Sequence, residues 1–141
     1  MRLALRFEAA CALLAARVAT RTVRFITIAR AMGWTEGTAQ LGLKGNDLKR
    51  AAAVGDAIAA ANRLFRFREA CLAEAIAGKW MLARRGVATT LYVGMRIRGS
   101  AAMAPRSEIT AHIGMHAWLT AGTKTITGAS EQPHKTVASF Y

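Results

Sequence analysis

Cys71 and His116 are the thiol and the imidazole whose contexts best suit chemistry. Cys71 opens the run CLAEAIAGKWMLARRG, and His116 stands beside a tryptophan in MHAWLTAG. A thiolate can attack a carbonyl carbon, while an imidazole takes the thiol proton and returns it to the leaving amine. The two residues of such a pair can come from distant segments, so their types indicate nucleophilic acyl chemistry.

The residues alone leave a packing role open for both cysteines. If Cys71 opens a helix, the positive end of the helix dipole and the nearby Arg66 and Arg68 favour its thiolate. However, NRLFRFREAC has no Ser, Thr or Asp immediately before Cys71, and a continuous helix from about Arg63 would bury the thiol in mid-helix. Packing is more strongly indicated for Cys11, whose neighbours are all apolar.

The histidines can equally be interpreted as structural residues without a chemical role, and the sequence leaves this interpretation open. A structural role is the default for His112, His116 and His134 when nothing else is known. His112 and His116 have an H-x-x-x-H spacing, but Gly114 and the alternating pattern indicate a strand, on which the two rings lie about 13 Å apart. We therefore expect no metal site.

The elements that must position these residues begin with a helix. Residues 3–31 lack Gly and Pro and are rich in Ala, Leu and Arg, which predicts one helix over most of that span. The spacing predicts a core stripe along this helix, formed by Leu3, Phe7, Leu14 and Phe25. It also predicts a basic stripe, formed by Arg6, Arg17, Arg21 and Arg24. The basic stripe is interpreted either as a solvated face or as a docking surface for an acidic peptide, a partner protein or lipid headgroups.

Helical composition resumes after a glycine-rich connection over residues 33–46. Asn46 or Asp47 is the expected N-cap, and the last helix of the series should end at Arg84 and Arg85 with Gly86 behind them.

Beyond Gly86 the apolar period changes from about 3.6 to 2, which predicts strands. Leu91, Val93, Met95 and Ile97 alternate with polar or small residues in the first strand. In the second strand one face carries Ile113, Met115, Ala117 and Leu119, and the other carries His112, Gly114, His116 and Trp118. Gly122 makes a turn before TKTITG, and TVASFY forms a short last strand.

This order of elements predicts an α+β fold, with N-terminal helices followed by a small antiparallel sheet. At 141 residues we expect one domain over 1–141, with a basic helix and glycine-rich connection in 1–45 and the core in 46–141.

The composition restricts the partners and the compartment. Twenty Lys and Arg against 8 Asp and Glu give a formal charge of +12, which favours nucleic acid, an anionic membrane surface or an acidic polypeptide. Two cysteines without a disulfide pattern suit free thiols in a reducing, cytoplasmic setting, and no uncharged run reaches the length of a membrane span.

Taken together, CLAEAIAGKWMLARRGVATTLYVGMRIR and HIGMHAWLTAGTKTITG resemble the Cys helix and His strand of the lasso-peptide leader peptidases. These are small cysteine proteases with a transglutaminase-like, papain-related fold. The family pattern is matched over about residues 65–141, at Cys71, Leu72, Leu82, Arg84, Arg85, Gly86, Leu91, Gly94, His116, Ala117 and Trp118. The chain length resembles the split form, which relies on a separate small precursor-recognition protein.

The resemblance implies roles for particular residues. Cys71 would be the nucleophile and His116 the general base and acid, with Trp118 beside the site. The family's third residue is an Asp about a dozen positions after the His, where this chain has Gly128. Glu131 is the nearest carboxylate that could orient His116, and Glu108, a Ser, a Thr or a backbone carbonyl are the alternatives.

The implied function is removal of the leader from a ribosomally made lasso-peptide precursor through a thioester at Cys71, without metal or cofactor. The implied partners are the leader peptide, the recognition protein and an ATP-dependent macrolactam cyclase, not nucleic acid. The basic surface, with Arg17, Arg21 and Arg24, would bind the leader, the recognition protein or a membrane face. A non-catalytic basic binding module and an acyl transferase of the same fold are the rival functions.

Overall fold

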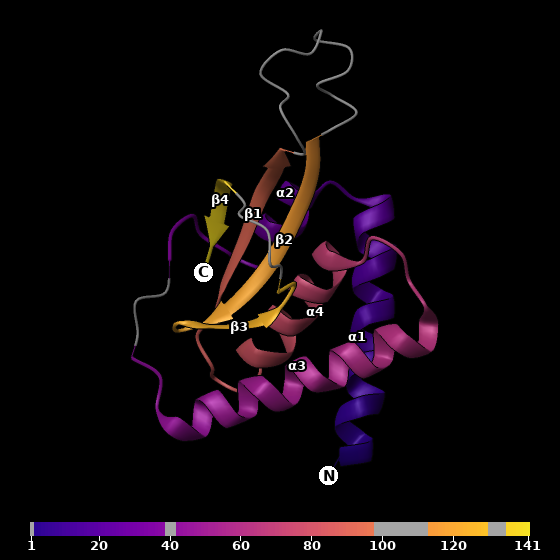
Figure 1. The fold of residues 1–141 in the computed structure, drawn as a ribbon, viewed down its shortest axis with the longest axis vertical. Helices are drawn as coiled ribbons and strands as arrows, with labels where there is room; N and C mark the ends of the chain where they lie inside the picture. Colours follow the sequence, from indigo (N-terminus) through magenta and orange to yellow (C-terminus); the bar gives the residue numbers. More distant parts are fainter. Residues whose placement is uncertain (1, 39–41, 98–112, 130–134) are drawn as a thin grey trace, which may run out of the picture.

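A computed structural model of the chain describes residues 2–38, 42–97, 113–129 and 135–141. Helices precede an antiparallel sheet (Figure 1), which confirms the predicted α+β class. The helices are α1 (Arg2–Thr22), α2 (Phe25–Ala31), α3 (Gly45–Phe65) and α4 (Cys71–Ala83). The strands are β1 (Thr90–Ile97), β2 (Ile113–Ala121), β3 (Lys124–Thr127) and β4 (Lys135–Phe140).

Helix α1 covers most of residues 3–31, as predicted, but the end of that span forms a separate helix. Helix α1 ends at Thr22, and Arg24 is extended with φ −64° and ψ 139° before α2 begins at Phe25. Arg24 therefore does not continue the basic face of α1. Helix α3 also starts before the expected cap, because Lys44 is its N-cap and Asp47 lies in its first turn, where a carboxylate meets the positive helix end.

Helix α4 is the central helix of the molecule. It packs against α1 and α3 on one side and against β1, β2 and β3 on the other (Figure 1). Gly78 allows the close approach of α4 to the sheet and to α3, because a Cβ there would lie 2.8 Å from Cδ2 of Leu119 in β2 and 3.3 Å from Cδ1 of Ile58 in α3. The first residue of this central helix is Cys71.

The predicted core face of α1 is exposed, while Arg6 and Arg21 of the predicted basic stripe are also exposed. Ala9, Ala12, Leu13 and Ala16 are buried in the core, whereas Leu3, Phe7, Leu14 and Val18 are 81%, 72%, 42% and 62% exposed. Small alanines let α1 lie close to α3 and α4, which leaves its larger side chains pointing outward. Of the four predicted core residues, Phe25 packs against the core from α2, and the other three were misassigned. We call Leu3, Phe7, Leu14 and Val18 the α1 stripe.

The sheet has the strand order β3-β2-β1-β4, with antiparallel neighbours. The pairing of β1 with β2 sets Gly94 opposite His116, Tyr92 opposite Trp118 and Leu91 opposite Leu119. The predicted alternation is confirmed in the middle of β2, since Ala117 and Leu119 are buried while His116 and Trp118 on the other face are half-buried. Met115 shares the face of Ala117 but is 72% exposed.

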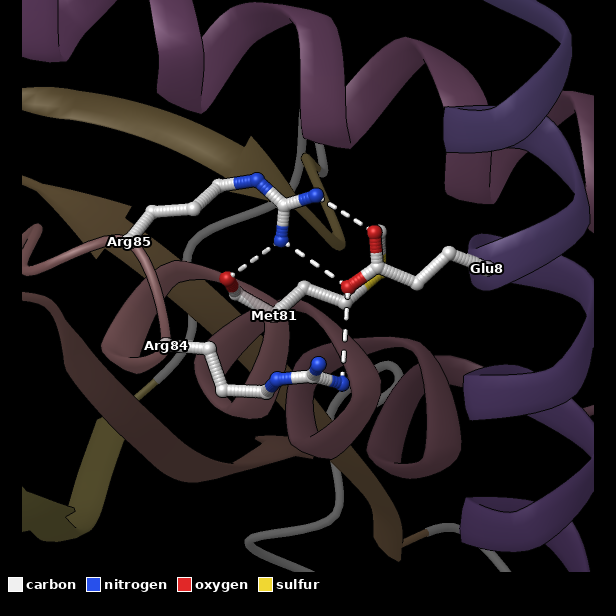
Figure 2. Close-up of polar contacts among 4 residues, drawn as sticks. All are labelled: Glu8, Met81, Arg84 and Arg85. Carbon is white, nitrogen blue, oxygen red and sulfur yellow. Dashed lines mark hydrogen bonds and ion pairs between the residues drawn. The ribbon is translucent and has the colours of Figure 1, made fainter.

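The end of α4 follows the predicted pattern and is also tied to α1. Gly86 has φ +68°, and the N–H groups of Val87 and Gly86 donate to the carbonyls of Leu82 and Ala83, which is the Schellman arrangement. Figure 2 shows the Arg85 guanidinium donating to both carboxylate oxygens of Glu8 in α1 and, at 2.8 Å, to the Met81 carbonyl. Arg84 lies 3.7 Å from the same carboxylate.

Candidate active site

Cys71 is the first residue of α4. This position decides between a thiol at a helix start and a thiol buried in mid-helix. Helix α3 ends at Phe65, so the thiol stands at a helix start and not in mid-helix, and it is half-buried. The N-cap residue, Ala70, makes no side-chain cap hydrogen bond. The first intrahelical bond runs from Glu74 N–H to the Ala70 carbonyl, so the amides of residues 71–73 lie ahead of the helical hydrogen bonds. Both cysteines are free thiols, and Cys11 is exposed, not packed as predicted.

His116 is oriented by a backbone carbonyl. Its Nε2 lies 2.7 Å from the carbonyl oxygen of Gly128, which follows β3. A carbonyl can only accept, so Nε2 carries the proton in this contact and Nδ1 carries the lone pair of the neutral ring. This is the tautomer in which Nδ1 can act as a base.

Gly128 occupies the place where the family resemblance predicts an Asp, and its geometry explains the departure. Its φ is +72°, and a Cβ would lie 2.3 Å from the Ala117 carbonyl oxygen and 3.0 Å from Cα of Trp118. No side chain fits such an approach without moving the backbone. The chain therefore presents a carbonyl to His116 where a carboxylate was expected, and a backbone carbonyl was among the predicted alternatives.

An aromatic ring lies beside the imidazole. The Trp118 ring stacks on His116 with centroids 6.0 Å apart and planes 20° apart. Tyr92 stacks on Trp118 at 5.3 Å and 11°, across the β1 and β2 pair. The predicted proximity of Trp118 to His116 is thus present, and Tyr92 extends the stack. Such flat contacts restrict rotation of the imidazole about its side-chain bonds.

Glu74 is a carboxylate that the sequence reasoning missed. It lies in the first turn of α4, three residues after Cys71 and therefore on a neighbouring part of the helix surface. Burial raises the pKa of Glu74, whereas a hydrogen bond with the Asn62 side chain and attraction to His116 act in the opposite direction. The attraction to His116 is the smallest of these three effects on the pKa of Glu74. The C-x-x-E spacing was the available sequence signal.

The other predicted site residues are dispersed or undescribed. Glu131, Glu108, His112 and His134 lie outside the described residues. Arg17 is half-buried and donates to backbone carbonyls before Cys71, whereas Arg21 and Arg24 are exposed. Across the described ranges, no three His, Cys, Asp or Glu side chains are grouped so that they could hold a metal ion. No helix among these residues is long and apolar enough to cross a membrane.

Lys79 marks a separate polar position on α4 that the sequence did not reveal. Its side chain is 4% exposed, with Nζ 2.8 Å from the Thr89 carbonyl oxygen and 5.5 Å from the centre of the Trp34 ring. Burial lowers the pKa of this amine to about 8. It borders a pocket of about 690 Å³ between α2, the end of α4 and the approach to β1.

The comparisons with known proteins agree with this architecture. A family model described as the transglutaminase-like superfamily matches residues 10–140, which is most of the chain. Neither a curated protein nor a solved structure matches the sequence. The matched range spans the positions of Cys71, Glu74, His116 and Gly128.

Proposed function

The chain belongs to the transglutaminase-like superfamily, and from that premise we propose that it is a cysteine peptidase that removes the leader from a ribosomally made lasso-peptide precursor. The superfamily uses cysteine chemistry for peptide hydrolysis or acyl transfer. The observation that carries the proposal is the position of Cys71 at the uncapped start of α4. A helix start stabilises both a thiolate and a developing oxyanion.

In the proposed reaction, His116 Nδ1 takes the thiol proton and the Cys71 thiolate attacks the carbonyl carbon of the scissile peptide bond. The negative charge on the former carbonyl oxygen faces amides at the start of α4. The carbon to nitrogen bond then breaks, and the imidazolium gives its proton to the leaving amine. Water, deprotonated by His116, attacks the thioester, which frees the leader carboxylate and restores the thiol.

Gly128 and Trp118 have the supporting roles in this reaction. The Gly128 carbonyl keeps the proton on Nε2, and the Trp118 ring holds the imidazole plane. A carbonyl stabilises imidazolium less than a carboxylate does, because it carries only a partial negative charge. We therefore expect slower turnover than in a site with a Cys, His and Asp triad.

The α1 stripe is the surface that we assign to the separate recognition protein. Its four apolar side chains are exposed on one face, and Arg6 and Arg21 on the same helix are exposed too. An apolar strip with basic residues near it suits a partner groove that is apolar with acidic edges. The leader peptide would then be delivered to Cys71 by that partner, and the ATP-dependent cyclase would use the amine that cleavage releases.

The decisive experiment compares Cys71→Ala and His116→Ala with wild type on a precursor peptide, with the recognition protein present and mass spectrometry as the readout. We expect both variants to lose cleavage by at least about a thousandfold, because each removes a covalent or proton-transfer role. Cys11→Ala is the matched control for loss of a thiol and should cleave normally.

Cleavage retained by either active-site variant would refute the assignment. Cross-linking of Cys71 to His116 by 1,3-dibromoacetone, a short bifunctional alkylating agent, tests their proximity without a substrate. A product carrying an added amine, in place of the free leader carboxylate, would favour the acyl transferase. Steeply salt-dependent binding to nucleic acid without cleavage would favour the basic binding module.

A further inference from the structure

The segment from Arg66 to Ala70, between α3 and α4, is a loop whose sequence favours helix. Arg, Phe, Arg, Glu and Ala include neither Gly nor Pro, so the sequence has no helix-breaking residue at this point. The loop nevertheless contains two left-handed residues, Arg66 with φ 52° and Glu69 with φ 53°. The left-handed conformation is sterically unfavourable for a residue with a Cβ, so a tertiary contact must favour the loop over a continued helix.

Arg17 of α1 supplies a polar contact of this kind, beside the packing of Phe67 against the core. Its Nη1 donates to the Glu69 carbonyl at 3.1 Å, and its Nη2 donates to the Arg68 carbonyl at 2.9 Å. Its guanidinium carbon lies 5.6 Å from the centre of the Phe67 ring. The planar fork of arginine matches two successive carbonyls, which a lysine ammonium cannot reproduce with the same geometry.

The two carbonyls that Arg17 binds are the ones a continuous helix would need. In an α-helix each N–H donates to the carbonyl four residues earlier, so the amides of Leu72 and Ala73 would take the carbonyls of Arg68 and Glu69. With Arg17 bound to both carbonyls, the first helical bond is that of Glu74 to Ala70. The amides ahead of it are then left at the start of a new helix.

We infer that Arg17 is a positioning residue, which breaks the helix that would otherwise run from α3 into α4 and so sets Cys71 at a helix start. The inference rests on the proposed function for its catalytic consequence, but the positioning itself concerns the resting protein. It gives Arg17 a role different from the substrate contact that its place in the basic stripe predicted.

The first test needs no substrate. The experiment uses a Cys11→Ser background, which leaves Cys71 as the one thiol. It compares the rate of Cys71 alkylation by iodoacetamide at neutral pH in this parent protein, in Arg17→Lys and in Arg17→Met. We expect Arg17→Met to slow alkylation roughly tenfold, because the helix start that favours a thiolate is lost. Arg17→Lys should fall between the two, and Arg30→Met, which removes an exposed arginine of α2, should match the parent.

Hydrogen exchange measured on the same proteins reports the position of the helix start. The amides of residues 71–73 should become more protected in Arg17→Met, because they acquire carbonyl partners in a continuous helix. A folded Arg17→Met with parental alkylation and parental exchange would overturn the inference. If Arg17→Met does not fold, the same two measurements on Arg17→Lys decide the question in the same way.

Precursor cleavage, once demonstrated, adds a kinetic readout. Arg17→Met should lower kcat and leave KM unchanged, because the nucleophile is displaced while the leader-binding surface remains. A rise in KM alone would return Arg17 to substrate binding and overturn the positioning role. If wild type cleaves no precursor, the proposed function fails, whereas the alkylation and exchange results still test Arg17 by themselves.

Discussion

Gly128 has two roles in the structure. Its carbonyl orients His116, and its lack of a side chain allows strand β2 to pack closely against it. A methyl group there would meet the Ala117 carbonyl oxygen at 2.3 Å in a backbone with φ +72°. We expect Gly128→Ala to lower the free energy of unfolding by at least about 2 kcal/mol, measured by urea denaturation. The same substitution should also displace the carbonyl from His116.

Gly122→Ala is the matched control for that prediction. Gly122 has a similar φ of +59°, but the nearest atom to an added Cβ is Cδ1 of Leu43 at 3.4 Å. Gly122→Ala should lower the free energy of unfolding by about 1 kcal/mol, which is the cost of the left-handed backbone without a steric clash. Equal losses at the two glycines would show that the close approach to β2 contributes nothing.

The burial of Lys79 predicts how the stability of the protein depends on pH. The pKa of Lys79 is about 8 in the folded protein because of burial, against an ordinary value of 10.5. The unfolded chain therefore binds more protons between these two pH values, so the folded state gains stability as the pH rises through that window. The gain is absent below about pH 8, where the amine is charged in both states.

Lys79→Met should remove this dependence. The difference in unfolding free energy between wild type and Lys79→Met should change by on the order of 2–3 kcal/mol from about pH 8 to pH 10.5. Denaturation at several pH values measures it, and the comparison cancels the other groups that titrate in the same range. A constant difference would contradict the burial of a charged amine.

At the scale of elements, two adjacent leucines of α1 lie on different sides of the helix, one buried and one exposed. Leu13 is fully buried, and Leu14 is 42% exposed. We expect Leu13→Ala to cost 2–5 kcal/mol, through lost burial and a cavity, and Leu14→Ala to cost less than about 1 kcal/mol. Thermal or urea unfolding of the two variants compares the faces directly, and the reverse ranking would restore the core stripe predicted from sequence.

The errors of sequence reading also lie at this scale. Strand positions were predicted well because a period of two, with Gly122 between β2 and β3, has few alternative interpretations. The core face of α1 was misassigned because Ala9, Ala12 and Ala16 give a weak apolar signal, whereas the α1 stripe gives a strong one. Close helix packing favours the small side chains, and such packing is not visible in one helix alone.

The candidate site was predictable in its residue types and not in its supports. Cys71, His116 and Trp118 are singled out by the family resemblance, whereas the residues alone leave packing or structural roles open. The support of His116 by the Gly128 carbonyl could not be identified, because it depends on a backbone turn after β3. The start of α4 was ambiguous for a similar reason, since Arg17 lies 51 and 52 residues from the carbonyls it binds.

At the scale of the whole molecule, the charge of +12 makes salt a stabiliser. Like charges repel in the compact state more than in the expanded chain, and added ions screen that repulsion. We expect the Tm to rise when NaCl is increased from about 0.01 M to about 0.15 M, over which the Debye length falls from about 30 Å to about 8 Å. An unchanged or lower Tm would mean that local ion pairs, such as Arg85 with Glu8, outweigh the net repulsion.

Helix α1 holds α4 at both ends, through Arg17 near its start and through Glu8 at its finish. These links join residues 51 to 77 positions apart, so they close late and slow the search for the native state. During synthesis, α1 leaves the ribosome long before the segments that it braces. The Arg17 link can form once Glu69 is free, but both links are in place only after Arg85 is free. An excised fragment that keeps the cysteine motif without α1 would keep the residues and lose the contacts that position them.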